Sequence, residues 1–240
     1  MRTWMVTGGT SGLGEEILNV LCRSAYRVGS RPIADRESAV VHDIRCDFTD
    51  WRGAVFEIER SIRTVGYLPN VLVNCAGKNL ICETDEMEEQ SFSDVFRVNV
   101  FFPLMLTAKL VKDNLFGVRP IVVNIGSSAS TQAGAYSAAY VASKHALTGV
   151  TRSLAKDYGD RIRVCQINFG KLGGTKMSRY IDQRQAELRG ITVQEERDRQ
   201  RFGWKDGKEI PLRAAAQFVI EMVEEDFSET ENGGVVRYGC

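Results

Sequence analysis

The chain has 240 residues, 43% of them hydrophobic and 26% charged, and its 31 basic residues balance its 31 acidic residues. These proportions are ordinary for a globular protein, and a chain of this length can bury a substantial core. The formal net charge of +0 argues against a nucleic-acid-binding protein that relies on bulk positive charge. No apolar run reaches membrane-spanning length, so we expect neither nucleic-acid nor membrane partners.

The six cysteines are scattered along the chain and form no C-x-x-C pair. They do not cluster with His42 or His145, so we expect no metal site. Scattered thiols in a domain of this size are typical of a reducing compartment. The first residues lead directly into a strand pattern, without the apolar segment of a signal peptide. We therefore expect a cytoplasmic protein.

The chain begins with a strand pattern over residues 3–7, a glycine-rich loop over residues 8–14 and a helical pattern. This order is the context that a dinucleotide-binding loop requires. Gly8 allows a tight turn, Gly12 lets the backbone approach a pyrophosphate, and Gly14 lets the helix pack close to the strand. The helix N-terminus then offers unpaired N–H groups to phosphates. The other loop residues that we assign to the cofactor site are Thr10, Ser11 and Leu13.

The second strand pattern covers residues 26–30 and ends at Ser30, followed by Arg31. In dinucleotide-binding folds this region contacts the adenosine ribose. A hydroxyl and a guanidinium suit a 2′-phosphate, because arginine binds phosphate through two parallel hydrogen bonds. We therefore favour NADP(H) as the cofactor, with NAD(H) as the alternative. Arg31 can equally be a solvated loop residue.

Strand and helix patterns alternate through the rest of the chain. Strands are predicted at residues 40–46, 70–74, 119–126, 161–167 and 234–238, and helices at 51–65, 86–116, 211–227 and along a stretch that ends near residue 158. Such alternation predicts an α/β fold, a doubly wound parallel sheet of Rossmann type with helices on both faces. We see no linker or repeat, so residues 1–240 are predicted to form a single domain, with a substrate lid at about 171–210.

The strongest chemical signal lies between Ser127 and Lys144. Ser127 ends the apolar run I-V-V-N-I-G, and Tyr140 and Lys144 lie four positions apart, one turn apart on the same face of a helix. An ammonium beside a phenol favours the phenolate, so we expect Tyr140 to exchange a proton nearer to neutral pH. The Ser127 hydroxyl would hold a carbonyl or alcohol oxygen. Because such a pair also occurs by chance, it is informative only together with the glycine loop.

Together these motifs resemble the short-chain dehydrogenase/reductase family, in its compact single-domain branch, up to about Asn168. The segment Thr7-Gly8-x-x-x-Gly12-x-Gly14 is similar to the cofactor loop of that family. Residues 74–77, N-C-A-G, are similar to its N-N-A-G motif, with cysteine in place of the second asparagine. The positions of its catalytic tetrad are filled by Asn99, Ser127, Tyr140 and Lys144.

The resemblance implies a role for each member of the tetrad. Tyr140 is the general acid/base, and Lys144 lowers the pKa of the tyrosine and binds the nicotinamide ribose. Ser127 holds the substrate oxygen, and Asn99 supports a water in the proton relay. The nicotinamide carries the hydride. The resemblance also implies cofactor contacts by Asp47, Phe48, Asn74, Ala76, Gly77, Gly170 and Thr175. Phe169 stands where the family has a proline.

The sequence thus predicts an NADP(H)-dependent oxidoreductase that acts on a small-molecule carbonyl or alcohol. Two alternatives remain: a non-catalytic nucleotide-binding regulatory protein, and an epimerase or dehydratase that uses bound NAD. In the lid, Arg179, Tyr180 and Arg184 either face a polar or anionic substrate or lie on a solvated helix. Apolar residues at 101–106 and 147–154 suggest a homodimer or homotetramer.

Overall fold

The computed structural model describes residues 2–21, 25–30, 41–201 and 207–240. Its centre is a seven-stranded sheet in the order β3-β2-β1-β4-β5-β6-β7. All six neighbouring pairs are parallel. The strands are β1 (Trp4–Thr7), β2 (Ala25–Gly29), β3 (Val41–Arg45), β4 (Val71–Asn74), β5 (Ile121–Ser127), β6 (Arg163–Phe169) and β7 (Val235–Tyr238). This architecture confirms the predicted α/β class.

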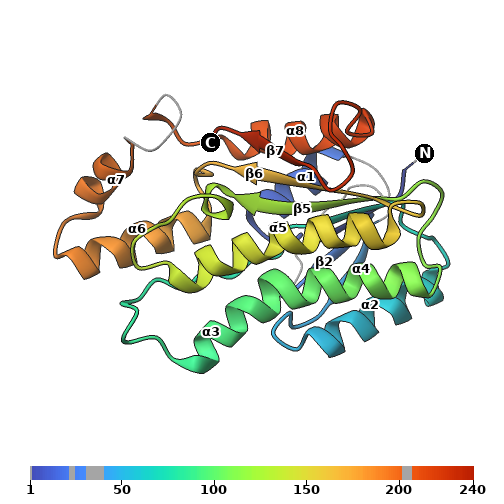
Figure 1. Ribbon diagram of the computed structural model, residues 1–240, viewed down its shortest axis with the longest axis horizontal. Coiled ribbons are helices and arrows are strands. Elements are labelled where there is room, and N and C mark those ends of the chain that lie inside the picture. The colour runs from blue at the N-terminus through green and yellow to red at the C-terminus, as the bar shows by residue number, and fades with distance from the viewer. Residues whose placement is uncertain (1, 22–24, 31–40, 202–206) are drawn as a thin grey trace.

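Helices cover both faces of the sheet (Figure 1). One face is covered by α1 (Gly12–Leu21) and α8 (Leu212–Glu224). The other is covered by α2 (Trp51–Val65), α4 (Phe102–Lys112) and α5 (Ala138–Tyr158). Since both faces are buried at the centre of the sheet, the central strands β1, β4 and β5 are almost continuously apolar instead of alternating with polar residues.

The described residues also form three further α-helices and a short 3-10 turn, Ser128–Ser130. The three helices are α3 (Glu89–Phe96), α6 (Lys176–Arg189) and α7 (Val193–Arg201). In Figure 1, α6 and α7 lie at the end of the molecule where β5 ends and α5 begins. They occupy the predicted lid region. Phe202 and Trp204, which the sequence suggested as closing groups, fall outside the described residues.

The sheet order reverses its direction between β1 and β4. From β1 the chain moves outward to β2 and β3, and it then returns to the other side of β1 to continue through β4 and β5. The connections on the two sides lead away from one another, which leaves a crevice at the carboxyl ends of these strands. The fold therefore positions any ligand site beside the loop that follows β1.

The predicted helix over residues 86–116 is in fact interrupted. A π-helical turn, Arg97–Phe101, separates α3 from α4. Pro103 lies in the first turn of α4, and it has no N–H to donate to the carbonyl of Asn99 four residues earlier. Single π turns of this kind often mark functional sites.

Candidate active site

A cavity of about 480 Å³ lies at the reversal point of the sheet. Its walls come from the loop after β1, the carboxyl ends of β4, β5 and β6, the first turns of α5, and α6. Thirteen of the predicted cofactor residues line it: Gly8, Thr10, Ser11, Gly12, Leu13, Ser30, Phe48, Ala76, Gly77, Tyr140, Lys144, Gly170 and Thr175. Ser127 lines it as well. The structure thus brings together residues that are more than 160 positions apart in sequence.

The glycine loop is shaped by close backbone contacts. Gly8 has a φ of +69°, and a β carbon there would lie 2.9 Å from the Ala76 backbone. A β carbon on Gly14 would lie 2.5 Å from the Gly8 carbonyl oxygen, so only glycine lets the helix start this close to the strand. The loop therefore presents bare backbone at the start of α1, where N–H groups can bind phosphate.

Several predicted residues do not line the cavity. Gly14 packs behind the loop, and Asp47 is exposed and accepts hydrogen bonds from the Thr49 N–H and hydroxyl groups. Asn74 is buried and donates to the Asn124 amide oxygen at 2.8 Å, which ties β4 to β5. Arg31, the residue on which the NADP(H) preference rests, lies outside the described residues.

The lysine beside the candidate tyrosine is held by the sheet. Lys144 is buried, and its Nζ donates to the main-chain carbonyl of Ile125 at 2.8 Å. The same Nζ lies 5.7 Å from the centre of the Tyr140 ring. Ser127 approaches the phenol from the end of β5. The three side chains therefore meet at one wall of the cavity, as their spacing predicted.

Burial shifts the pKa values of Tyr140 and Lys144. Burial raises the pKa of the Tyr140 phenol, and the hydrogen bond with the Ser127 hydroxyl lowers it in part. Burial also lowers the pKa of the Lys144 ammonium to about 8. Burial thus favours the neutral form of both groups, because a buried charge loses part of its hydration. The expected net lowering of the Tyr140 pKa beside Lys144 is not seen here, because burial has the largest effect on the phenol.

The lowered pKa of Lys144 predicts a specific pH dependence of stability. Between pH 8 and its ordinary pKa of 10.5, Lys144 is protonated when unfolded and largely neutral when folded. Stability from this residue therefore rises with pH across that window. We expect the free energy of unfolding of the wild type, relative to Lys144→Met, to rise by about 1–2 kcal/mol between pH 7.5 and 9.5. Urea denaturation measures it.

The exposed Lys156 on the same helix is the matched control for this measurement. Lys156→Met should show no such pH-dependent difference from the wild type, because its exposed ammonium keeps its hydration when the chain folds. A flat difference for Lys144→Met would contradict the lowered pKa.

The side chain of Asn99 is buried and forms hydrogen bonds within the protein. Its amide oxygen accepts from the Lys78 N–H at 2.8 Å. Its amide nitrogen donates to the Lys78 carbonyl and to the Ser143 hydroxyl, both at 2.9 Å. The side chain thus fastens the loop after β4 to α5. The main-chain carbonyl of Asn99 lacks its ordinary helical donor, because residue 103, four positions later, is a proline without an N–H.

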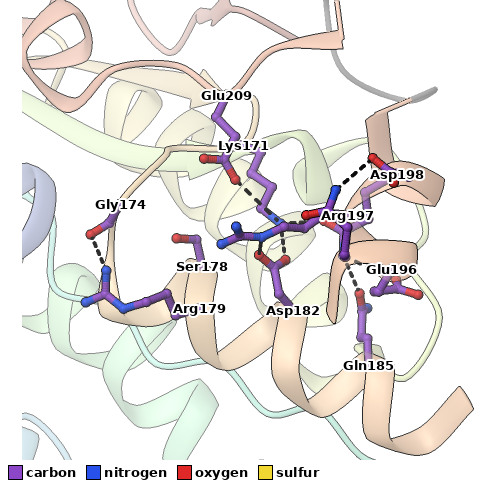
Figure 2. A network of polar contacts seen from close by, with 12 residues as sticks. Lys171, Gly174, Ser178, Arg179, Asp182, Gln185, Glu196, Arg197, Asp198 and Glu209 are labelled. Carbon is purple, nitrogen blue, oxygen red and sulfur yellow. Dashed lines mark hydrogen bonds and ion pairs between the residues drawn. The ribbon is translucent and has the colours of Figure 1, made fainter. Parts of the chain in front are cut away.

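The lid carries a buried ionic network (Figure 2). Asp182 of α6 is completely buried, and it binds both Lys171 from the loop after β6 and Arg197 of α7, the latter at 2.9 Å. Gln200 of α7 accepts from Lys171 and donates to the Gln185 amide oxygen at 3.0 Å. These contacts join α6 and α7 to the cavity wall, since Lys171, Gln185 and Gln200 all line it.

The lid residues suggested for substrate contact face elsewhere. Arg179 donates to the Gly174 carbonyl, Arg184 pairs with Glu187 on the surface, and the Tyr180 hydroxyl accepts from the Ile81 N–H at 3.3 Å. None of the three lines the cavity in the part of the chain that the structure describes. The cavity residues that the sequence analysis missed include Gln132, Lys171, Met177, Ile181, Gln185 and Gln200. No motif marks them.

No cluster of three or more His, Cys, Asp or Glu side chains in the described ranges has the geometry to hold a metal ion. None of the helices described is both long and apolar enough to cross a bilayer.

The sheet order, the reversal crevice and the glycine loop define a Rossmann-type dinucleotide-binding protein. Comparison with known proteins narrows this class. The family model for short chain dehydrogenase matches residues 2–186, more than half of the chain. The protein therefore belongs to the short chain dehydrogenase family, whose members are NAD(P)-dependent oxidoreductases.

The individual relatives are distant in sequence. Over 190 aligned residues the chain is 28% identical to a short chain dehydrogenase/reductase of Colletotrichum higginsianum. The alignment covers 73% of this chain and 71% of the relative. A short chain dehydrogenase family protein from Francisella tularensis subsp. tularensis SCHU S4 superposes with a TM-score of 0.87 at 23% identity, over 99% of this chain and 96% of that one. A 4-hydroxyisoleucine dehydrogenase complexed with NADH superposes with a TM-score of 0.84 at 20% sequence identity, over 99% of this chain and 96% of that one. These two structures support the fold.

Proposed function

We propose that the protein transfers a hydride between NADP(H) and a small carbonyl or alcohol substrate, with Tyr140 as the general acid/base. The observation that carries the proposal is the convergence of Ser127, Tyr140 and Lys144 on the same cavity as the glycine loop. The cofactor supplies the hydride chemistry when bound, and the protein supplies orientation and proton transfer.

The cavity is suited to a dinucleotide. No Asp or Glu side chain is among the described residues that form its walls, and Lys176 offers a positive charge there. Lys144 and Lys171 also line the cavity, but Lys171 is paired with Asp182. The loop after β1 adds bare glycine backbone and the hydroxyls of Thr10 and Ser11. A pyrophosphate is stabilised by N–H groups, hydroxyls and nearby positive charge, and carboxylates would repel it.

The proton path follows from the contacts around Tyr140. In reduction, the Tyr140 phenol donates its proton to the substrate oxygen, which the Ser127 hydroxyl holds beside it. The raised pKa keeps this phenol protonated, and thus able to donate, near neutral pH. Lys144 orients the cofactor ribose, and the Asn99 main-chain carbonyl holds a water that returns the proton from solvent.

The choice between NADP(H) and NAD(H) depends on the end of β2. Ser30, the described residue that follows β2, lines the cavity. We keep the preference for NADP(H), although one structural neighbour is complexed with NADH. We expect Arg31→Ala to weaken NADPH binding by about tenfold or more and to leave NADH binding nearly unchanged, since only NADPH carries a 2′-phosphate. Titration of the fluorescence of each reduced cofactor measures this.

A substrate screen tests the proposed activity. The purified protein would be assayed with a panel of alcohols and ketones and with both cofactors, following the absorbance of the reduced nicotinamide. Turnover that depends on Tyr140 supports the proposal. Cofactor binding without turnover on the whole panel would contradict it.

We also propose that the protein is a homodimer or homotetramer in the cytoplasm. Phe101 and Met105 are 45% and 39% exposed beside one another at the start of α4, and they support a homodimer or homotetramer. Leu147 and Leu154 of α5, by contrast, are buried in the protein's own core. Five described cysteines are free thiols, which supports the cytoplasm. Sedimentation analysis measures the assembly.

A further inference from the structure

A buried polar cluster lies directly beneath Ser127. Its centre is Gln166 of β6, which is completely buried, and Asn168, which pairs with Gly126 across the β5–β6 ladder. A β carbon on Gly126 would lie 1.9 Å from the Asn168 amide oxygen and 2.7 Å from the Gln166 amide nitrogen. The two amides thus fill the space that a side chain before Ser127 would need.

This cluster reaches the backbone of Ser127 through one hydroxyl. The Gln166 Nε2 donates to the Ser130 Oγ at 3.3 Å, and the same Oγ accepts from the Ser127 N–H at 3.3 Å. Ser130 itself is only 4% exposed, so water does not compete for these contacts. In return, the Ser127 Oγ accepts from the Ala129 N–H at 3.2 Å. The two contacts fix both the backbone and the hydroxyl of Ser127.

The other end of the cluster is anchored in the core. The Gln166 Nε2 also contacts the Thr148 hydroxyl at 2.9 Å and the Asn168 amide oxygen at 2.7 Å. Its Oε1 accepts from the Thr151 hydroxyl of α5 at 3.1 Å. Thr151 accepts in turn from Asn124 of β5 at 2.9 Å. Gln166 is thus surrounded by four polar side chains, Ser130, Thr148, Thr151 and Asn168, which favour one orientation of its amide. The Asn168 Nδ2 has no hydrogen-bond partner among the described residues.

We propose that Gln166 and Ser130 are positioning residues that hold the Ser127 hydroxyl against the Tyr140 phenol. The inference rests on the proposed function, because it assigns the cluster to the orientation of that site. Neither residue touches the reacting atoms. Ser130 does not line the cavity within the described residues, although Ser127 and Ser128 do.

The arrangement has a chemical consequence at Tyr140. The hydrogen bond with the Ser127 hydroxyl lowers the pKa of the phenol against the effect of burial. If the Ser127 backbone loses the Ser130 acceptor, its hydroxyl samples other orientations and this hydrogen bond weakens. The phenol then titrates at higher pH. A residue that acted only on stability would leave that titration unchanged.

The test compares Ser130→Ala with the wild type. We expect kcat to fall about tenfold while the dissociation constant of the reduced cofactor stays within twofold, since the glycine loop is untouched. We also expect the rise of kcat with pH in alcohol oxidation to occur at higher pH in this variant, because oxidation of the alcohol needs the phenolate form of Tyr140 as the base. Ser130→Thr keeps the oxygen and should restore most of kcat. Ser130→Gly is the second deletion variant in case Ser130→Ala folds poorly.

The neighbouring Thr131 provides the matched control. It is exposed and does not line the cavity in the described part of the chain, so Thr131→Ala should keep the activity of the wild type. Unchanged kcat and pH profile in folded Ser130→Ala or Ser130→Gly would overturn the positioning role. So would a loss of kcat that Ser130→Thr fails to restore.

A second readout separates this inference from the proposed function. Ultraviolet difference titration of the wild type against Tyr140→Phe reports the phenol of Tyr140 alone, without any substrate. Repeating it in the Ser130→Ala background should give a higher pKa for that phenol. An unchanged phenol pKa overturns the inference even if the protein is an active reductase. A raised pKa in a protein without turnover supports the positioning and contradicts the proposed function.

Discussion

Replacement of Tyr140 with phenylalanine is expected to reduce kcat by about 10³-fold, within the range that a general acid/base contributes. The substitution removes one oxygen and leaves the ring that packs at the cavity wall. Cofactor affinity should therefore stay within a fewfold of the wild-type value. Steady-state kinetics on the best substrate of the screen, together with fluorescence titration of the reduced cofactor, measure the two quantities separately.

Tyr158 offers the matched control for this substitution. It lies on the last turn of the same helix, packed against the core beneath α2 and α4 and away from the cavity. Tyr158→Phe should keep kcat within about twofold, since its hydroxyl lies outside the proposed proton path. Near-parental turnover in Tyr140→Phe would remove the acid/base assignment.

Replacement of Asp182 with asparagine is expected to lower the free energy of unfolding by about 2–3 kcal/mol. The carboxylate is completely buried and binds two cations, so its loss leaves Lys171, whose side chain is 12% exposed, without its closest opposite charge. Arg197 is 40% exposed and can turn to water, which places the expected effect below the largest values for buried pairs. Urea denaturation monitored by tryptophan fluorescence measures it.

The surface pair on α7 is the control for this change. Asp198 contacts Arg201 at 3.3 Å, and both side chains are more than half exposed, so Asp198→Asn should alter stability by less than about 1 kcal/mol. Asp182→Asn should also raise KM for the substrate more than for the cofactor, because the network holds the lid side of the cavity. Equal stability losses for the two variants would contradict the view that burial makes Asp182 important.

Local signals explain why so much of the fold is readable from sequence. The helix predicted over residues 51–65 is α2, with Asp50 accepting from the Gly53 N–H at its start and the left-handed Gly66 at its end. Both ends are fixed by residues within a few positions of one another. The helix predicted over 86–116 is interrupted by the π turn before Pro103, and the Asn99 side chain in this turn makes contacts that spacing along the segment does not reveal. Asn99 bonds Lys78, 21 positions away, and Ser143, 44 positions away.

The same division holds for the candidate site. The glycine loop and the Tyr140–Lys144 pair are patterns within single segments, so the sequence by itself determined the class of fold, the dinucleotide loop and the candidate acid/base. Only the tertiary structure decided the direction in which burial shifts the pKa values of Tyr140 and Lys144, the wall formed by Lys171, Gln185 and Gln200, and the link from Ser127 through Ser130 to Gln166. Spacing along one segment determines which residues share a helix face. Burial and hydrogen bonding between distant segments depend on how the whole chain packs, and these set the pKa values and orientations on which the chemistry depends.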